Sequence, residues 1–264
     1  MIEDIKTKKA ILKNDMITLF NGDCFEVLKK IKSKSVNMVF ADPPYFLSNG
    51  GISCHSGKQV SVNKGEWDEG LSPEEKLKFN RRWIRMCKRI LTDDGSIWIS
   101  GTYHNIYSIG VALELEGFSI INNITWQKPN PAPNLACRCF THSTETVIWA
   151  RKIISKKKKG NHCFNYLDMK EQNNNKQMKD VWLLPLPSKK EKLSGKHPTQ
   201  KPLSLLNRII QASTKEGDVI LDPFNGSGTT GISAVSLNRK YIGIEREKEY
   251  CELTMKRLEM EGII

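Results

Sequence analysis

The sequence predicts an α/β protein in which helices cover both faces of a mostly parallel sheet, and three observations support this fold class. Segments with the hydrophobic patterns of strands and helices alternate along most of the 264 residues. An apolar run at 38–41 stops at Asp42, before two prolines that cannot extend a central strand. A glycine-rich turn, Gly226-Ser-Gly-Thr-Thr-Gly231, separates another apolar strand from a helix. We therefore expect one domain over residues 1–264, with ligands at the carboxyl ends of its strands.

The amino-terminal half shows this alternation clearly. Asn21-Gly-Asp23 supplies turn and helix-capping residues between the first strand and the first helix. Ser72-Pro-Glu-Glu75 begins a helix with a capping serine, a proline and two acids, and Thr92-Asp-Asp-Gly95 ends it. The expected elements are strands at 16–20, 38–41, 96–100 and 118–126 and helices at 24–31, 72–91 and 105–116. This rhythm is typical of a parallel sheet.

The segment 47–70 is polar, contains several glycines and has no strong hydrophobic period. A loop of this length inside a compact domain is often a functional lid. We therefore interpret 47–70 as a mobile loop over the active site; a disordered insertion is the alternative.

The alternation breaks between residues 128 and 196, which we interpret as an inserted region with one strand at 145–150. Its lysines at 156–159 suit a phosphate backbone, although such runs are also common in solvated loops. Cys137, Cys139 and His142 lack the regular spacing of a zinc site, so no metal is expected. The elements expected after this region are helices at 203–213, up to 237, and at 248–259, and strands at 218–222 and 240–244.

Composition favours a polyanionic partner. The formal net charge is +12, and neither a basic amphipathic helix nor an apolar span is evident, so we expect nucleic acid and no membrane. A role of this charge in solubility alone is the alternative. The seven cysteines are irregularly spaced and no signal peptide is evident, which favours reduced thiols in a cytoplasmic protein.

The glycine turn at 226–231 matches a dinucleotide fingerprint, with Glu245 at the end of the next strand to hold ribose hydroxyls. A solvent-facing acid is the alternative reading of Glu245. Only 33 residues follow Gly231, so the other strands of this sheet must come from the amino-terminal half. Asp42 and Asp222 then lie at one edge, with a reacting group at the first and a cofactor at the second.

Three motifs in this order resemble the β-group amino-methyltransferases of DNA, which use S-adenosylmethionine: Asp42-Pro-Pro-Tyr45, His197-Pro-Thr-Gln-Lys-Pro202 and Asp222-Pro-Phe-Asn-Gly-Ser-Gly-Thr-Thr230. The resemblance covers nearly the whole chain. It implies a Rossmann-like methyltransferase fold with circularly permuted motif order, and it places 128–196 where this family has its target-recognition region. The segments 41–51, 126–134 and 141–146 further resemble the second adenine methylase of GATC restriction-modification systems, an enzyme type that also accepts single-stranded DNA.

The resemblance also implies roles for individual residues. The catalytic residues would be Asp42, Pro43, Pro44 and Tyr45. Those that bind the cofactor would be Asp23, Cys24, Asp42, Lys201, Asp222, Phe224, Asn225, Gly226, Ser227, Gly228, Thr229, Thr230, Glu245 and Arg246. Those that bind DNA, double-stranded and in some cases single-stranded, would be Trp126, Lys128, Asn130, Arg138, His142, Ser143 and His197. A homodimer is a further expectation.

The motif chemistry favours N6 of adenine as the acceptor. Asp42 and the Pro43 carbonyl could accept the two N–H bonds of an exocyclic amine, while Tyr45 stacks on the base. Methylation of cytosine C5 needs a cysteine nucleophile, typically after proline, and the chain has no Pro-Cys pair. Asp rather than Ser at position 42 resembles the adenine pattern. A cytosine N4 or RNA amino-methyltransferase, an NAD-dependent oxidoreductase and an inactive nucleic-acid-binding module remain alternatives.

Overall fold

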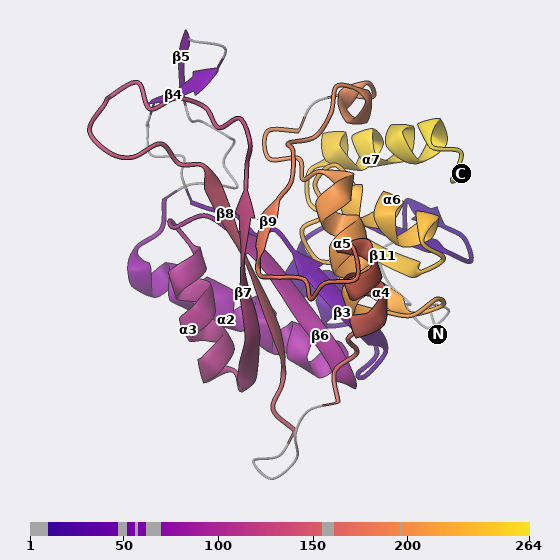
Figure 1. The fold of residues 1–264 in the computed structure, drawn as a ribbon. Coiled ribbons are helices and arrows are strands. Elements are labelled where there is room, and N and C mark those ends of the chain that lie inside the picture. The colour runs from indigo at the N-terminus through magenta and orange to yellow at the C-terminus, as the bar shows by residue number, and fades with distance from the viewer. Residues whose placement is uncertain (1–9, 47–51, 56–57, 62–69, 155–160, 196) are drawn as a thin grey trace.

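The computed structural model describes residues 10–46, 52–55, 58–61, 70–154, 161–195 and 197–264. In this part of the chain nine strands form one sheet, in the order β1-β2-β11-β10-β3-β6-β8-β7-β9 (Figure 1). The strands are β1 (Leu12–Lys13), β2 (Ile17–Asn21), β3 (Val36–Ala41), β6 (Leu91–Gly101), β7 (Phe118–Gln127), β8 (Thr144–Lys152), β9 (Val181–Leu183), β10 (Val219–Asp222) and β11 (Lys240–Glu245). The helices are α1 (Cys24–Leu28), α2 (Pro73–Ile90), α3 (Ile106–Leu115), α4 (Tyr166–Gln172), α5 (Leu203–Ser213), α6 (Thr229–Ser236) and α7 (Lys248–Met260), with a 3₁₀ turn at Lys190–Lys192.

The sheet is mostly parallel, as expected. Strands β2, β11, β10, β3 and β6 are parallel to one another, and β9 is parallel to β7. The exceptions are β1, which pairs antiparallel with β2 at one edge, and β8, which pairs antiparallel with both β6 and β7. The strand expected at 145–150 therefore does not stand apart in an insertion, and it separates β6 from β7 in the sheet.

Both ends of the chain build one half of the sheet. Strand β11 pairs with β2 and β10 pairs with β3, so the last two strands lie between the first ones. This confirms the expectation that the carboxyl-terminal segment completes a sheet begun near the amino terminus. Because these strands are parallel, β3, β10 and β11 all end at the same edge.

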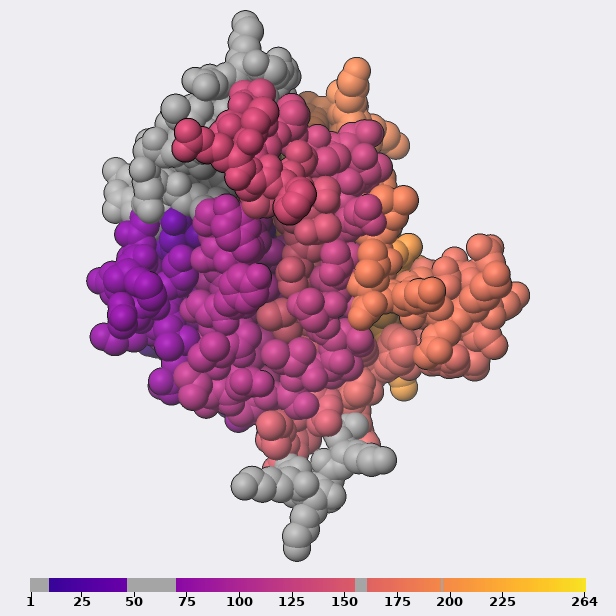
Figure 2. Space-filling model, turned by 60° about the vertical axis from the view of Figure 1, so that its left-hand side comes forward, coloured from indigo at the N-terminus to yellow at the C-terminus, as the bar shows by residue number. Residues whose placement is uncertain are grey.

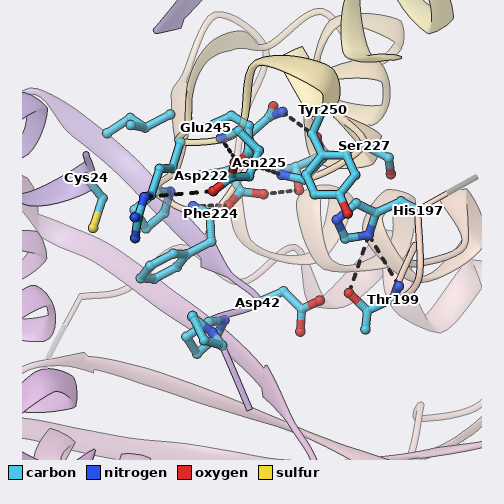
Figure 3. A pocket seen from close by; sticks show the side chains of 18 of the residues that line it. Cys24, Asp42, His197, Thr199, Asp222, Phe224, Asn225, Ser227, Glu245 and Tyr250 are labelled. Carbon is cyan, nitrogen blue, oxygen red and sulfur yellow. Dashed lines mark hydrogen bonds and ion pairs between the residues drawn. The ribbon is translucent and has the colours of Figure 1, made fainter. Parts of the chain in front are cut away.

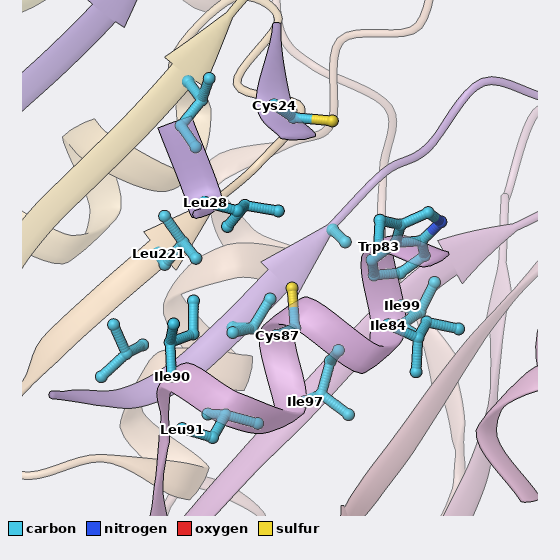
Figure 4. Packing of buried hydrophobic residues seen from close by; sticks show 14 of the residues in the cluster. Cys24, Leu28, Trp83, Ile84, Cys87, Ile90, Leu91, Ile97, Ile99 and Leu221 are labelled. Carbon is cyan, nitrogen blue, oxygen red and sulfur yellow. The ribbon is translucent and has the colours of Figure 1, made fainter. Parts of the chain in front are cut away.

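Two apolar clusters hold the helices against the sheet. Helices α1, α2 and α3 pack on one face, and α5, α6 and α7 on the other. Figure 4 shows the first cluster, where Trp83, Ile84 and Cys87 of α2 lie beside Ile97 and Ile99 of β6. Trp98, between these isoleucines, faces the second cluster because neighbouring strand residues point to opposite faces.

Helix α2 begins and ends where the sequence predicts, but the next strand begins earlier than expected. Ser72 and Glu75 form a reciprocal capping box. The helix ends at Ile90, just before Thr92–Gly95; the next strand was expected from residue 96, whereas β6 begins at Leu91 and accommodates these residues as a bulge opposite β3. A side chain at Gly95 would meet the Asn37 carbonyl oxygen at 2.9 Å, so the close approach of β3 requires glycine here.

The segment interpreted as a mobile loop, 47–70, lies largely outside the described residues. Its described part contains an antiparallel hairpin of β4 (Ile52–His55) and β5 (Lys58–Ser61). The lysines at 156–159 are also outside the described residues. Among the helices that the structure describes, none is long and apolar enough to cross a membrane.

Candidate active site

The shared edge of β3, β10 and β11 opens into one cavity (Figure 3). Asp42 follows β3, Asp222 ends β10 and Glu245 ends β11, so three predicted carboxylates line the same space. The cavity is also lined by these predicted residues: Asp23, Cys24, Pro43, Pro44, Tyr45, His197, Lys201, Phe224, Asn225, Gly226, Ser227, Thr229, Thr230 and Arg246. The structure thus brings the three motifs together.

Asp42 accepts a hydrogen bond on each carboxylate oxygen. The Tyr45 hydroxyl donates to Oδ1 at 2.6 Å, and the Lys201 ammonium donates to Oδ2 at 2.6 Å. Burial raises the pKa of Tyr45 well above its usual value, and the Asp42 charge raises it further, so Tyr45 remains a hydroxyl donor. Asn105, at the start of α3, donates to the Pro44 carbonyl at 2.9 Å and so anchors the turn after β3.

Asp222 holds the glycine turn through two hydrogen bonds. Its Oδ2 accepts the Thr230 hydroxyl at 2.6 Å, and its Oδ1 accepts the Phe224 amide at 3.0 Å. Burial raises its pKa to about 7, although these two hydrogen bonds act in the opposite direction. Asp222 therefore holds the turn that carries most of the residues predicted to bind the cofactor.

Glu245 faces the turn from the neighbouring strand. Its two carboxylate oxygens accept the amides of Gly226 at 2.7 Å and Glu247 at 2.9 Å. Burial raises its pKa to about 7. Glu245 is thus a buried acid in the cavity wall, and its alternative reading as a solvent-facing acid is wrong.

Gly226 and Gly228 both have a positive φ, but they serve different neighbours. Gly226 lines the cavity, and a side chain there would come within 3.3 Å of the His197 ring. Gly228 is not part of the cavity wall; a Cβ at this position would meet Thr254 of α7 at 2.4 Å. Gly228 is thus the predicted cofactor residue that does not line the cavity, and the packing of α7 accounts for a glycine at this position.

Two aromatic rings outside the three motifs, Phe46 and Phe79, also line the cavity. Phe79 of α2 lines it together with Phe46 and Phe224, and its ring centroid lies 5.4 Å from that of Phe46. The Phe224 ring packs edge-on against buried Trp83 at 5.4 Å. Sequence reasoning placed α2 correctly, but the periodicity of a helix does not tell which distant loop its rings will meet.

The two ends of the cavity are marked by Cys24 and by the segment before α5 (Figure 3). Asp23 caps α1 by accepting the amides of Phe25 and Glu26. At the other end the His197 ring lies 4.3 Å from the Tyr250 ring of α7. His197 was expected to bind DNA, and the structure places it beside Gly226 in the wall of the cavity.

The other residues predicted to bind DNA fall into two groups. Trp126 is 1% exposed and donates its indole N–H to the Leu184 carbonyl, so its burial does not fit a DNA contact. Lys128 pairs with Glu145 at 2.6 Å and is mostly buried. Asn130, Arg138, His142 and Ser143 lie in the loop between β7 and β8, where the first three are exposed. Figure 2 shows this crimson loop projecting at the top of the molecule.

This loop stands at the cavity edge of the sheet. Strand β7 is antiparallel to β8, which is antiparallel to β6, so β7 ends at the same edge as β3. Cys139 and His142 lie 4.0 Å apart, and the described residues contain no group of three or more side chains suited to a metal ion.

Comparisons with known proteins agree on one family. A family model described as DNA methylase, N6_N4_Mtase, matches residues 36–256. The type II methyltransferase M2.DpnII of Streptococcus pneumoniae is 62% identical over 258 residues, which cover 98% of this chain and 95% of that protein. The crystal structure of the M1.HpyAVI–SAM complex is 32% identical, with a TM-score of 0.68 and coverage of 92% of this chain and 99% of that one. PvuII DNA methyltransferase, described as cytosine-N4-specific, has a TM-score of 0.75 at 20% identity, with coverage of 95% and 89%, a likeness in fold alone.

Proposed function

This chain belongs to the N6 and N4 DNA methylase family, and we propose that it methylates the exocyclic N6 amine of adenine. A relative that is 62% identical is a type II methyltransferase. The chain is therefore an S-adenosylmethionine-dependent DNA methyltransferase of the restriction-modification type. The observation that carries the adenine proposal is the Asp42 carboxylate, which lies with Tyr45 in the wall of the cavity that contains the glycine turn.

The cavity fits the cofactor. Glu245 provides a buried carboxylate for the ribose hydroxyls, and Phe224 provides an apolar ring beside the glycine turn. Gly226 has no side chain, which keeps the space between the turn and the His197 ring open. Asp23 and Cys24 would lie near the adenine ring of the cofactor. When bound, S-adenosylmethionine would supply an electrophilic methyl group. An amine nitrogen can bond to this methyl carbon while the bond from the carbon to the positively charged sulfur breaks.

Asp42 would make the acceptor amine a better nucleophile. The amine lone pair of adenine is delocalised into the ring, so the amine is a weak nucleophile. Asp42 and the Pro43 carbonyl accept its two N–H bonds and draw the nitrogen toward a tetrahedral geometry, in which its lone pair is available. This contribution is mainly one of positioning and electrostatics.

The target base must leave the duplex to reach Asp42, at a cost of about a few kcal/mol. We propose that Tyr45 stacks on the extruded base. Single-stranded DNA avoids most of this cost, which supports the proposal that it is also a substrate. GATC is the proposed recognition site, on the resemblance of the segments 41–51, 126–134 and 141–146 to methylases of that specificity.

Cytosine N4 is the alternative target. A cytosine-N4-specific enzyme has a similar fold, so the fold does not distinguish the two reactions. The residue at position 42 favours adenine.

The test is methylation of oligonucleotides with labelled S-adenosylmethionine, on single-stranded and duplex DNA with and without GATC. We expect N6-methyladenine after digestion to nucleosides; N4-methylcytosine as the labelled product would contradict the proposal. Asp42→Asn keeps the shape of the side chain and should lower the methylation rate by at least about 100-fold, with cofactor affinity within about tenfold of wild type. Near-normal turnover in this variant would show that the reaction does not require the Asp42 carboxylate.

A further inference from the structure

A buried network of charges surrounds Asp42. The Lys201 ammonium lies 2.6 Å from Asp42 Oδ2, 3.1 Å from the Tyr45 hydroxyl and 3.5 Å from Glu145 Oε2. The Lys201 side chain is 6% exposed and that of Glu145 is 13% exposed. The other oxygen of Glu145 accepts from Lys128 at 2.6 Å. Lys201 was expected to bind the cofactor, and Glu145 was not among the expected site residues.

The fold explains why these side chains meet. Alternate residues of a strand share a face, so Asp42 points to the same face as Phe40, and Glu145 to the same face as Val147. Phe40 and Val147 both belong to the apolar cluster on which α5 packs. Lys201 lies two residues before the start of α5 and therefore arrives on that face.

The network keeps its central members ionised. Burial would lower the pKa of Lys201, but the charges of Asp42 and Glu145 and the hydrogen bond to Asp42 raise it well above its usual value. Burial would likewise raise the pKa of Glu145, but Lys201 and Lys128 lower it. Oε2 of Glu145 makes no hydrogen bond in the described structure and lies 3.5 Å from the Lys201 ammonium.

We propose that Lys201 is a positioning residue that fixes the Asp42 carboxylate for the target amine, and that Glu145 in turn holds Lys201. This inference rests on the proposed function. The Lys201 ammonium and the Tyr45 hydroxyl each occupy one lone pair of a different Asp42 oxygen, which fixes the plane of the carboxylate. Each oxygen retains a further acceptor site for the amine.

Loss of this constraint should affect catalysis more than cofactor binding. In Lys201→Met the side chain keeps its length but no longer orients Asp42. A misplacement of about 1 Å lowers a reaction rate by roughly 100-fold, and we expect a fall in kcat of this order. Lys201→Arg keeps the charge and should recover part of the rate.

The experiment measures four quantities for each variant: kcat, KM for DNA, the Kd of S-adenosylmethionine by calorimetry, and Tm. Lys152→Met is the matched control, because Lys152 is 7% exposed and donates to the Leu91 carbonyl at the opposite end of β6. It should lower Tm while leaving kcat unchanged. If Lys201→Met loses cofactor affinity in proportion to its rate, Lys201 is a cofactor ligand and the proposal is wrong.

A second readout does not depend on turnover. Wild type should bind DNA with adenine at the target position more tightly than DNA with purine there, because purine lacks the amine that Asp42 accepts. Lys201→Met should reduce this preference. An equal preference in variant and wild type would overturn the positioning role; absence of any preference in wild type, together with no methyladenine product, would instead contradict the proposed function.

A further variant covers the case in which Lys201→Met does not fold, since it leaves Glu145 with one fewer cationic partner. Lys201→Met combined with Glu145→Gln removes both charges, so that no carboxylate at position 145 is left without the Lys201 cation. We expect the double variant to fold, to bind S-adenosylmethionine and to remain about 100-fold slow. A double variant with wild-type kcat would also contradict the proposal.

Discussion

The three glycines of the turn at 226–231 each make room for a different neighbour. Gly226 approaches the His197 ring, Gly228 approaches Thr254, and a side chain at Gly231 would lie 2.7 Å from the Tyr241 ring. The pattern correctly predicted a turn between a strand and a helix. It could not tell which glycine faces the ligand, because that depends on where α7 and β11 pack.

Substitution of Gly228 should therefore reduce stability before it affects binding. Gly228→Ala combines a positive φ of 76° with a contact of 2.4 Å to the Thr254 methyl group, and we expect it to lower the free energy of unfolding by about 3 kcal/mol. Gly217→Ala is the control, because Gly217 has a φ of 81° and no neighbour within 4 Å. It should cost only about 1 kcal/mol. Urea unfolding of both variants gives the comparison.

Thr254→Ser distinguishes the two causes. It removes the methyl group that lies closest to the added Cβ, so the double variant should recover part of the stability that Gly228→Ala loses. If the double variant is no more stable than Gly228→Ala, contact with Thr254 is not the reason for this glycine.

Glu245 should make cofactor affinity depend on pH. Its pKa of about 7 means that the carboxylate ionises between pH 6 and pH 8, and an ionised carboxylate is the stronger acceptor for ribose hydroxyls. We expect affinity for S-adenosylmethionine to rise by up to about tenfold over this range, measured by calorimetry. Glu245→Gln should bind more weakly and should lose much of this dependence. An identical pH profile in the variant would assign the effect to another group, such as Asp222.

Asp222 and Glu245 also determine how the stability of the protein without ligand depends on pH. The pKa values of Asp222 and Glu245 are raised on folding from about 4 to about 7. Their folded forms therefore bind protons more tightly than the unfolded chain. Their contribution to stability is present at low pH and is lost as pH rises through about 7.

Among the elements, the loop between β7 and β8 is the best candidate for contact with DNA bases. Phe140 lies near the end of this loop, and its side chain is 96% exposed. In the same loop the His142 ring stacks on Tyr103, which follows β6, with centroids 4.9 Å apart. Residues 128–143 contain no acid. An exposed ring at the cavity edge suits stacking on an unpaired base.

Phe140→Ala should weaken binding of single-stranded DNA by about tenfold, because stacking on one ring contributes roughly 1–3 kcal/mol. Fluorescence anisotropy with labelled oligonucleotides measures this. Leu167→Ala serves as the control: Leu167 is 74% exposed on α4, whose first turn is fixed to the end of α5, away from the cavity. Equal losses in both variants would count against a specific role of the loop.

Most elements could be predicted because their signals are local. The apolar strand before Asp42, the capping box of α2 and the start of α5 all depend on neighbouring residues. The position of β8 could not be predicted, since its pairing with β6 depends on contacts far apart in sequence. The same holds for Glu145, which joins the site only because of that pairing.

For the whole molecule, the net charge of +12 predicts a strong salt dependence of DNA binding. Neutralised phosphates release counterions, so we expect DNA affinity to fall by at least about tenfold between 50 and 200 mM salt. S-adenosylmethionine is a small ligand that displaces no comparable set of counterions, so its affinity should change by less than about threefold. Titrations of both ligands at several salt concentrations test this, and a DNA affinity independent of salt would contradict a role for the charge.

The placement of β10 and β11 between β2 and β3 has a consequence for the order of synthesis. A ribosome makes Asp42 long before Asp222, and at about 5–20 residues per second the delay is roughly 10–40 s. During this time the nascent chain carries Asp42 but not the strands that complete the cavity around it. A chain that terminates before residue 219 lacks this half of the cavity altogether, and we therefore expect it to be inactive.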